Sequence, residues 1–417
     1  MPEFFNVLPP DEARSLLLEQ MGPKIAPETV DTSVALGRVT VEPVAAPHAL
    51  PSFRRSTMDG YAVKATDTFG ASATLPAFLA VTGEIAMGKA ATIELSKGEA
   101  VVVHTGGMLP AAADAVVQVE QTQAVGRSTG GRFPFEIEVF RAVAPGQNVL
   151  QVGEDVAEGS TVLPAGHLVR PQDVGALLAL GITAVDVARR PRVVILATGD
   201  EVVAPDQSVG PGQIRDINSH TVAAQATKAG AIPILGGIVP DSFETLCKAA
   251  ESGLDEGDML VMSAGSSVSV RDLTVRVIDE LGEPGVLLHG VATRPGKPTI
   301  VGVVSGKPVI GLPGNPVSAM IQFAMFGVPA IYRLQGLAQT PMSGSVWARV
   351  TQNIASETGR EDYVPARLIE TKEGLQTEPV FGKSNLIFTL VNADGLIKVP
   401  LNQGGLAAGE WVQVQLF

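Results

Sequence analysis

The chain has 417 residues, of which 45% are hydrophobic and 18% are charged. This composition excludes a disordered chain and supplies enough apolar side chains for more than one buried core. The formal net charge is −13 and no run of basic residues stands out, so we expect no nucleic-acid partner. A single cysteine, Cys247, can form neither an internal disulfide nor a thiolate metal cluster, and we expect it to be a packed core residue.

The N-terminus and the longest apolar run bear on the protein's location. Residues 1–14 lack the basic stretch and apolar core of a signal peptide. The longest apolar run, residues 317–332, contains Gln322, Gly327 and Pro329 and is shorter than the roughly 20 residues of a membrane span. We therefore expect a soluble, cytoplasmic protein with no membrane partner.

Changes in sequence texture predict an α/β multidomain protein. A helix is expected over residues 10–20, and short β-rich runs separated by Gly and Pro turns follow. Because residues 1–47 and 145–188 are each too small to bury a core alone, we expect them to pack together. The predicted domains are 1–47 plus 145–188 as a linker domain, 48–144 as an inserted β-rich lobe, 189–334 as a central α/β domain, and 335–417 as a small all-β, barrel-like domain.

The central region alternates between predicted strands and helices, which is typical of a mostly parallel sheet covered on both faces. Apolar runs predict strands over 193–197, 232–239, 258–263, 299–304 and 308–312, and those over 193–197 and 258–263 are expected to be buried.

The helix signals of the central region lie between these strands. A helix is expected over about 219–229, and a second over the DLTVRVIDEL segment. Asp241 with Glu244 predicts a capping box at the start of another helix. Asn315 and Pro316 predict the start of a long helix that Pro329 kinks or ends.

Small and polar residues follow three of the predicted strands. Glycine lets the backbone approach a ligand, and a helix start offers free N–H groups to an anion. Since ligands of such sheets bind at the carboxyl ends of the strands, these turns predict a site for a phosphate-bearing ligand. The candidate binding residues are Thr198, Gly199, Asp200, Ser263, Gly265, Ser267, Pro313, Gly314, Asn315 and Ser318.

Acidic residues accompany these turns. Asp200, Glu201 and Asp272 do not suit phosphate directly, but they suit Mg²⁺ between phosphates or the donor edges of a pterin. One such turn occurs in any α/β domain, whereas three in one sheet favour a binding site. None is a P-loop or a dinucleotide-binding fingerprint.

Two further segments carry candidate chemistry. Arg294 and Lys297 flank a Pro-Gly turn that can hold two cations toward an oxyanion, although a solvated loop is the alternative. In RRSTMDGYAV, Asp59 and Gly60 form a turn before a short strand, and alone such a turn is common.

Taken together, these segments resemble the MoeA family of molybdopterin molybdenumtransferases, which is related to the C-terminal domain of gephyrin. The resemblance runs over nearly the whole chain, and its most specific anchors are MDGYAV and GLPGNPVSA. The remaining anchors are GEDV (153–156), TGDEV (198–202), SAGSSVSVRD (263–272) and RPGKP (294–298).

The resemblance implies an enzyme that inserts molybdenum from molybdate into adenylated molybdopterin with release of AMP, and that uses Mg²⁺. It also implies a homodimer whose N-terminal domain mediates dimerisation. In that dimer, the central domain of one subunit faces the MDGYAV region and C-terminal domain of the other. The adenylating enzyme of the pathway is a further expected partner.

The resemblance also implies roles for individual residues. Catalytic roles are implied for Asp59, Asp155, Glu201, Asp272, Arg294 and Lys297, and metal binding for Glu201, Asp241 and Asp272. For Asp241, this role stands beside that of a helix cap. Arg360 in GREDYVPARL and Ser384 in GKSNLIF are implied to bind the anionic substrate.

The chain also departs from the family pattern. Ala264 and Ser269 stand where many members have glycine, and Gly290 stands where the family often has lysine, which leaves one cation fewer for molybdate. Arg294 likewise replaces a lysine.

Three other functions stay open at this point. A non-catalytic pterin-binding scaffold would bind the adenylated pterin without turnover, but has less need of so many carboxylates. An enzyme of similar fold acting on another nucleotide is disfavoured by MDGYAV and RPGKP, which are not general nucleotide motifs. A tungstate-preferring homologue cannot be separated by sequence, because tungstate and molybdate have the same charge and nearly the same shape.

Overall fold

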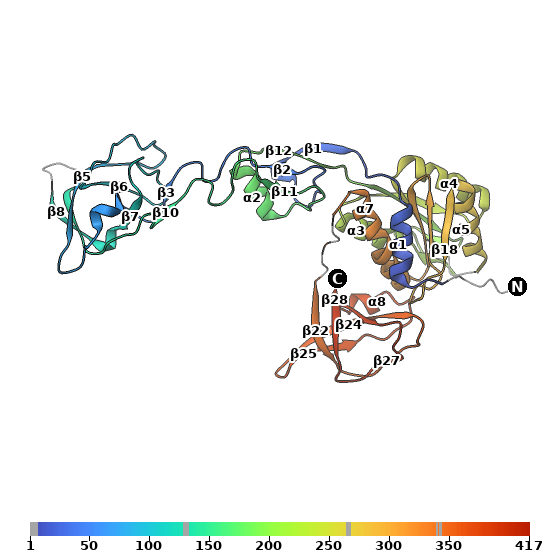
Figure 1. Cartoon of the computed structure of the whole chain (residues 1–417). Helices are drawn as coiled ribbons and strands as arrows, with labels where there is room; N and C mark the ends of the chain where they lie inside the picture. The colour runs from blue at the N-terminus through green and yellow to red at the C-terminus, as the bar shows by residue number, and fades with distance from the viewer. Residues whose placement is uncertain (1–6, 128–132, 264–267, 339–340, 342–343) are drawn as a thin grey trace. The chain divides into compact units, whose positions relative to one another are not determined.

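The computed structural model describes every residue except 1–6, 128–132, 264–267, 339–340 and 342–343. The chain forms two compact units, whose elements are labelled in Figure 1. The larger unit comprises residues 1–42, 165–171 and 184–417. The smaller unit comprises residues 43–164 and 172–183.

A six-stranded sheet forms the centre of the larger unit. Its first four strands are parallel, as predicted, and the last two are antiparallel to their neighbours. The fourth and fifth strands correspond to the predicted strands 308–312 and 299–304. The turn that joins them is a hairpin through Ser305 and Gly306, both at positive φ, which matches the twist of a tight hairpin. The strands in spatial order are β16 (Ile232–Val239), β13 (Arg192–Thr198), β17 (Met259–Ser263), β21 (Lys307–Leu312), β20 (Ile300–Val304) and β18 (Pro284–His289).

Helices cover both faces of this sheet (Figure 1). One face packs against α4 (Phe243–Glu256) and α5 (Val268–Leu281), and Cys247 is buried in this core as predicted. The other face packs against α1 (Pro10–Gln20), α3 (Asn218–Lys228), α6 (Pro316–Gln322) and α7 (Val328–Leu334). This double coverage explains the unbroken apolar runs of the central strands.

The helix that begins after Asn315 continues through Pro329 by way of a π-helical turn, Phe323–Gly327. Proline removes one backbone donor and clashes with the preceding turn, and the wider π turn relieves this conflict. By length and apolar composition alone the stretch Pro316–Leu334 is able to cross a membrane, but 67% of it is buried inside the structure. Packing against the sheet accounts for its apolar character.

The central domain differs from the sequence prediction in two details. Helix α4 is capped by Ser242, whose hydroxyl accepts from the Thr245 N–H, so the cap lies one residue after Asp241. Aspartate and serine are equally good caps, and the sequence does not distinguish them. Strand β18 was not predicted; it begins with Pro284, a residue that argues against a strand.

The C-terminal domain is a closed β-barrel. Pairing of β24 with both β25 and β26 closes the ring, and α8 (Phe388–Val391) lies after β25. The two-residue strand β19 (Thr293–Arg294) of the central domain pairs with β24 and joins the two domains. The barrel strands are β24 (Glu361–Thr371), β25 (Gly374–Pro379), β22 (Ser345–Val350), β28 (Trp411–Leu416) and β26 (Gly395–Val399), and β23 (Ile354–Ala355) pairs with β27 (Gly405–Leu406).

Short ladders connect the segments that precede and follow the inserted lobe. Strand β1 (Pro27–Asp31) pairs with β12 (Ala184–Ala188) in the larger unit. In the smaller unit, β2 (Val44–Ala45) pairs with β11 (Thr161–Leu163), and α2 spans Pro171–Ala179. The first and third segments of the chain therefore pair with each other around the insertion.

The inserted lobe is built on a six-stranded sheet with an apolar core on each face. A short ladder of β3 (Arg55–Ser56) with β10 (Val149–Leu150) lies at its entry. The sheet strands in order are β7 (Ala115–Gln118), β4 (Gly60–Val63), β6 (Glu99–Val103), β5 (Ala77–Glu84), β9 (Pro134–Val139) and β8 (Thr122–Arg127).

Candidate active site

The carboxyl ends of β13, β17 and β21 lie side by side at one edge of the central sheet. The Thr198 hydroxyl donates to the Ser263 carbonyl at 3.2 Å and links the first two ends. The Asn218 amide donates to the Ser263 hydroxyl at 3.0 Å and to the Gly314 carbonyl at 2.8 Å. Three predicted binding turns are therefore held together by direct hydrogen bonds.

Sequence reasoning missed Asn218, the first residue of α3. Its side chain is buried, and its Oδ1 atom has no hydrogen-bond partner among the described residues. Leaving a buried acceptor without a hydrogen bond costs free energy. The Asn218 Oδ1 atom is therefore a candidate acceptor for a donor group of a bound ligand. The only available signal was a polar residue at a helix start, which is ordinary in any α/β protein.

Carboxylates collect beside the first strand end. The Asp241 N–H donates to Asp200 Oδ1 at 3.4 Å, while Asp241 Oδ1 is buried without a partner among the described residues. Partial burial, together with the charges of Asp200 and Glu201, raises the pKa of Asp241. These three acidic side chains thus repel one another, which is the electrostatic environment that a cation relieves.

Gly265 and Ser267 lie outside the described residues, and Asp272 is exposed near the start of α5. Within the described ranges, no group of three or more His, Cys, Asp or Glu side chains is placed to hold a metal ion by itself. The metal-binding assignments stay predictions.

A cavity of about 700 Å³ lies between the central domain and the barrel, and it brings together predicted residues from four separated segments. The predicted residues in its lining are Arg294, Lys297, Pro313, Asn315, Ser318, Arg360 and Ser384. Lys383, Asn385 and Tyr363 also line it and were not predicted.

Direct hydrogen bonds fix the wall of this cavity where the two domains meet. The Asn315 amide donates to the Ser384 hydroxyl at 2.9 Å, and the Val317 N–H donates to the Ser384 carbonyl at 3.1 Å. Asn315 is the N-cap of α6 by position, as predicted, but its side chain bonds the barrel instead of capping the helix. Because Pro316 has no N–H and the Val317 N–H already bonds Ser384, this helix start is tied to the barrel and does not present a set of free N–H groups to the cavity.

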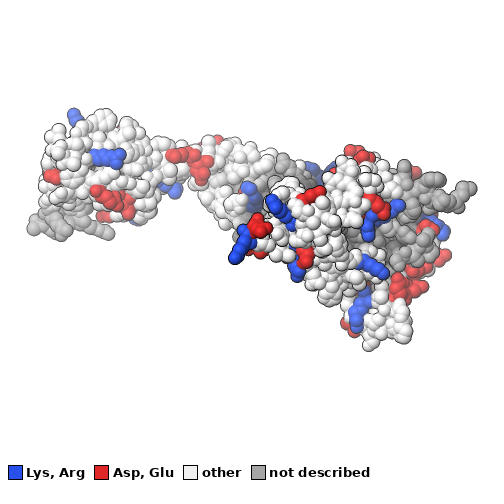
Figure 2. All heavy atoms as spheres, turned by 90° about the horizontal axis from the view of Figure 1, so that it is seen from below, with Lys and Arg blue, Asp and Glu red and all other residues white. Residues whose placement is uncertain are grey.

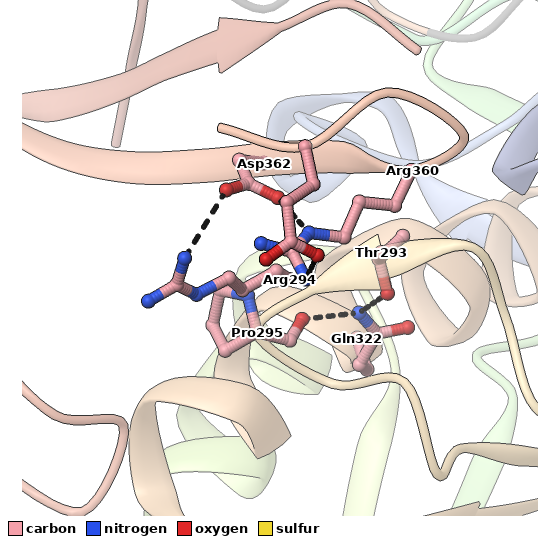
Figure 3. Close-up of polar contacts among 7 residues, drawn as sticks. Thr293, Arg294, Pro295, Gln322, Arg360 and Asp362 are labelled. Carbon is pink, nitrogen blue, oxygen red and sulfur yellow. Dashed lines mark hydrogen bonds and ion pairs between the residues drawn. The ribbon is translucent and has the colours of Figure 1, made fainter. Parts of the chain in front are cut away.

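Arginine side chains from both domains meet at this cavity (Figure 3). Arg360 Nε donates to Asp362 Oδ1 at 2.9 Å, and Arg294 Nη1 lies 3.7 Å from Asp362 Oδ2. Lys297 is exposed on the same loop. The predicted cations Arg294, Lys297 and Arg360 thus share one cavity.

Tyr363 lines the cavity and packs against the apolar core of the central domain. Its phenol donates to Glu361 at 2.6 Å, and burial together with this carboxylate raises the pKa of Tyr363. The side chain therefore stays a neutral phenol. On the face that Figure 2 shows, Lys and Arg are scattered among Asp and Glu.

Asp59 and Asp155 belong to the smaller unit, whereas the residues above belong to the larger one. Asp59 lies in the turn before β4, as predicted, and accepts from the Thr105 N–H at 2.8 Å and hydroxyl at 3.1 Å. These hydrogen bonds lower the pKa of the exposed Asp59 carboxyl. Asp155 is also exposed. Both carboxylates are therefore available to a ligand or to another chain.

Family models match nearly the whole chain. They describe the MoeA N-terminal region (domains I and II) over residues 8–181, a probable molybdopterin-binding domain over 194–333, and the MoeA C-terminal region (domain IV) over 348–417.

Similar proteins and structures agree with these matches. A putative molybdopterin biosynthesis protein of Methanocaldococcus jannaschii is 35% identical, covering 99% of this chain and 98% of the relative. The molybdopterin molybdenumtransferase of Haemophilus influenzae is 33% identical, covering 98% of each chain. A crystal structure of a molybdopterin biosynthesis MoeA protein from Pyrococcus horikoshii OT3 superposes with a TM-score of 0.84 at 30% identity, covering 99% of this chain and 100% of that one. The chain belongs to the MoeA family.

Proposed function

We propose that this chain is a molybdopterin molybdenumtransferase, which inserts molybdenum from molybdate into adenylated molybdopterin and releases AMP. The observation that carries the proposal is the cavity at which Arg294 and Lys297 meet Arg360 of the barrel. The hydrogen bond between Asn315 and Ser384 lies in the wall of this cavity. Asn218 hydrogen-bonds the Gly314 carbonyl, and so links the turn before Asn315 to the other strand ends. The larger unit thus carries a cavity lined by cationic side chains beside the polar carboxyl ends of β13, β17 and β21.

The strand ends and the cavity suit different parts of the substrates. The strand ends present hydroxyl, amide and backbone groups, which suit the pterin and phosphates of adenylated molybdopterin. The cavity presents guanidinium and ammonium groups, which suit the dianion molybdate. Local cations of this kind outweigh a distant acidic surface, so the net charge of −13 is no obstacle.

In this proposal, catalysis rests on positioning and electrostatics. Arg294, Lys297 and Arg360 hold molybdate where the dithiolene sulfurs of the pterin reach the metal. The strand-end groups fix the pterin and its phosphates so that loss of AMP is coupled to metal insertion. No covalent intermediate with the protein is required.

Mg²⁺ is the proposed cofactor, and the carboxylates beside the first strand end fit it. Asp241 has a buried, unpartnered oxygen near Asp200 and Glu201, and Mg²⁺ needs only one or two protein carboxylates in addition to substrate phosphates. Glu201, Asp241 and Asp272 remain the proposed ligands. When bound, the ion neutralises and polarises the pyrophosphate.

Replacement of Asp241 by Asn tests this assignment. A raised pKa in the folded state means that Asp241 contributes its full stability below its unfolded pKa, about 3.9, and loses it as the pH rises through the folded value. At pH 7 we therefore expect Asp241→Asn to have a higher Tm than wild type in the absence of Mg²⁺, and the difference to vanish in acid.

Thermal unfolding with and without Mg²⁺ completes this test. We expect Mg²⁺ to raise the Tm of the wild type and of the control Asp206→Asn, which alters an exposed carboxylate, but to have little effect on Asp241→Asn. An equal Mg²⁺ response of all three proteins would contradict the assignment.

A homodimer is proposed because Asp59 and Asp155 are exposed and belong to a unit separate from the cavity. In the dimer, the smaller unit of one subunit completes the site of the other. We also propose a cytoplasmic location and an encounter with the adenylating enzyme of the pathway, which supplies the adenylated substrate.

Replacement of Asp272 by Ala is expected to abolish molybdenum insertion while the dimer stays folded, since Asp272 is exposed near the start of α5. Molybdate-dependent AMP release and size-exclusion chromatography measure the two properties. Asp255→Ala, an exposed carboxylate of α4, is the control. Normal insertion by the Asp272 variant would remove this residue from the mechanism.

The function itself is tested by incubating the protein with adenylated molybdopterin, Mg²⁺ and molybdate and measuring AMP. Release that depends on molybdate supports the transferase. Binding of the adenylated pterin without AMP release under any oxyanion would favour the scaffold. Parallel titrations with tungstate decide which oxyanion the cavity prefers.

A further inference from the structure

The Asp362 side chain is 5% exposed and lies between two guanidinium groups. Arg360 Nε donates to one carboxylate oxygen at 2.9 Å, and Arg294 Nη1 approaches the other at 3.7 Å (Figure 3). Arg360 is two residues before Asp362 at the start of the barrel, whereas Arg294 comes from the central domain. One buried carboxylate therefore contacts a cation from each domain.

We propose that Asp362 is a positioning residue for the oxyanion cavity, and that it orients Arg294 and Arg360 as a pair. This inference rests on the proposed function and adds a residue to it. A carboxylate beside an anion site weakens the attraction of that site for anions, so its charge is unfavourable for simple binding. Its benefit is geometric, because a guanidinium group held in one orientation presents its remaining N–H donors in a fixed plane.

The backbone of the Arg294 loop is held independently of Asp362. Gln322, fully buried on α6, donates its amide N–H groups to the Thr293 hydroxyl and to the Pro295 carbonyl, both at 3.0 Å (Figure 3). A Cβ atom at Gly296 would come within 2.3 Å of the Gln322 amide nitrogen, so glycine is required for this approach. The β19–β24 ladder holds the same loop from the barrel side.

This arrangement separates two tasks. Gln322 and the ladder fix where the Arg294 backbone lies, and 63% of the Arg294 side chain is exposed. Among the described side chains, Asp362 is the one that forms an ion pair with the Arg294 guanidinium. Loss of Asp362 should therefore change the orientation of the guanidinium groups while the loop keeps its path.

The test compares Asp362→Asn, Asp362→Glu and wild type in molybdate-dependent AMP release. Asn has the shape of Asp but lacks the charge, whereas Glu keeps the charge on a longer side chain. If Asp362 orients the arginines, we expect kcat of the Asn variant to fall at least about tenfold, because small misplacements of reacting groups are costly. The KM for molybdate should rise less than about threefold, since one repelling charge is removed. The Glu variant should keep more activity than the Asn variant.

Two further variants make the experiment specific. Glu357→Gln removes a carboxylate that contacts Arg360 at 2.8 Å but is 75% exposed, and we expect kcat within about twofold of wild type. In an Arg294→Gln background, Asp362→Asn should cost less than it does alone, because one of the two arginines that Asp362 orients is already missing, and the remaining cost reports the contact with Arg360. Circular dichroism verifies the fold of each variant.

The outcomes separate the inference from the proposed function. An inactive wild type overturns both. An active wild type with kcat of Asp362→Asn within about threefold, or an Asn variant at least as active as the Glu variant, overturns the role of Asp362 alone. If the Asn variant does not fold, Arg360→Lys replaces it: this variant keeps the charge but loses the Nε contact, and kcat within about threefold of wild type would overturn the inference.

Discussion

Replacement of Lys297 by Met is expected to lower kcat/KM for molybdate-dependent AMP release by about a hundredfold or more. Lys297 lines the cavity and is exposed, so its loss removes a cation from the anion site without opening a core. Removal of one preorganised donor from an anionic transition state typically costs about 10²–10³-fold. The effect should be large if, as the family resemblance implies, Gly290 stands in place of a further lysine of the anion site.

The control for this prediction is Lys372→Met, which removes an exposed lysine between β24 and β25 of the barrel. Both variants lose one positive charge and gain the same side chain. Equal rates in the two would mean that Lys297 acts only through net charge, and would remove it from the site.

Replacement of Gly60 by Ala is expected to destabilise the smaller unit by about 1–3 kcal/mol or more. A Cβ atom at this position would lie 2.0 Å from the Val117 carbonyl oxygen, because β4 pairs with both β6 and β7. The backbone on both sides of β4 is fixed by these ladders and cannot move away cheaply. Thermal unfolding and limited proteolysis of the lobe measure the effect.

A matched substitution in the same unit is Gly175→Ala in α2, where an added Cβ atom meets no neighbour within 4 Å. This variant should be as stable as wild type or gain about 0.5–1 kcal/mol, since alanine favours a helix. Equal stability of the Gly60 and Gly175 variants would contradict the packing. The comparison of the Gly60 and Gly175 variants thus tests whether Gly60 of TMDGYAV has a packing role, as distinct from the ligand role expected for the exposed Asp59 beside it.

Much of the central domain follows from local patterns. The apolar runs of β13, β16 and β17 predicted strands, and of these β13 and β17 are buried whereas β16 is the largely exposed outer strand of the sheet. Parallel pairing then placed the polar ends of β13 and β17 side by side. The Asn315-Pro316 pair likewise predicted the start of α6. These features depend on neighbouring residues in the sequence, and local physics is sufficient for them.

Contacts between domains were beyond such patterns. The meeting of Arg294 and Arg360 depends on the two-residue ladder β19–β24, which has no sequence signal. The Pro-Gly turn pointed to Arg294, whereas the family resemblance alone pointed to Arg360. Gln322 interrupts an apolar helical stretch in the sequence, and nothing in that pattern indicates its hydrogen bonds to Thr293 and Pro295. Asp362 belonged to an ordinary charged run in GREDYVPARL. Their roles arise from tertiary pairing, which the local sequence does not encode.

The central claim is that the cavity between the two domains holds the oxyanion during metal insertion. Its most direct test is the molybdate dependence of AMP release from adenylated molybdopterin, measured in parallel for wild type and Lys297→Met. The account predicts AMP release that saturates with molybdate in the wild type and is reduced about a hundredfold or more in the variant. AMP release that is independent of molybdate, or equal in the two proteins, would contradict it.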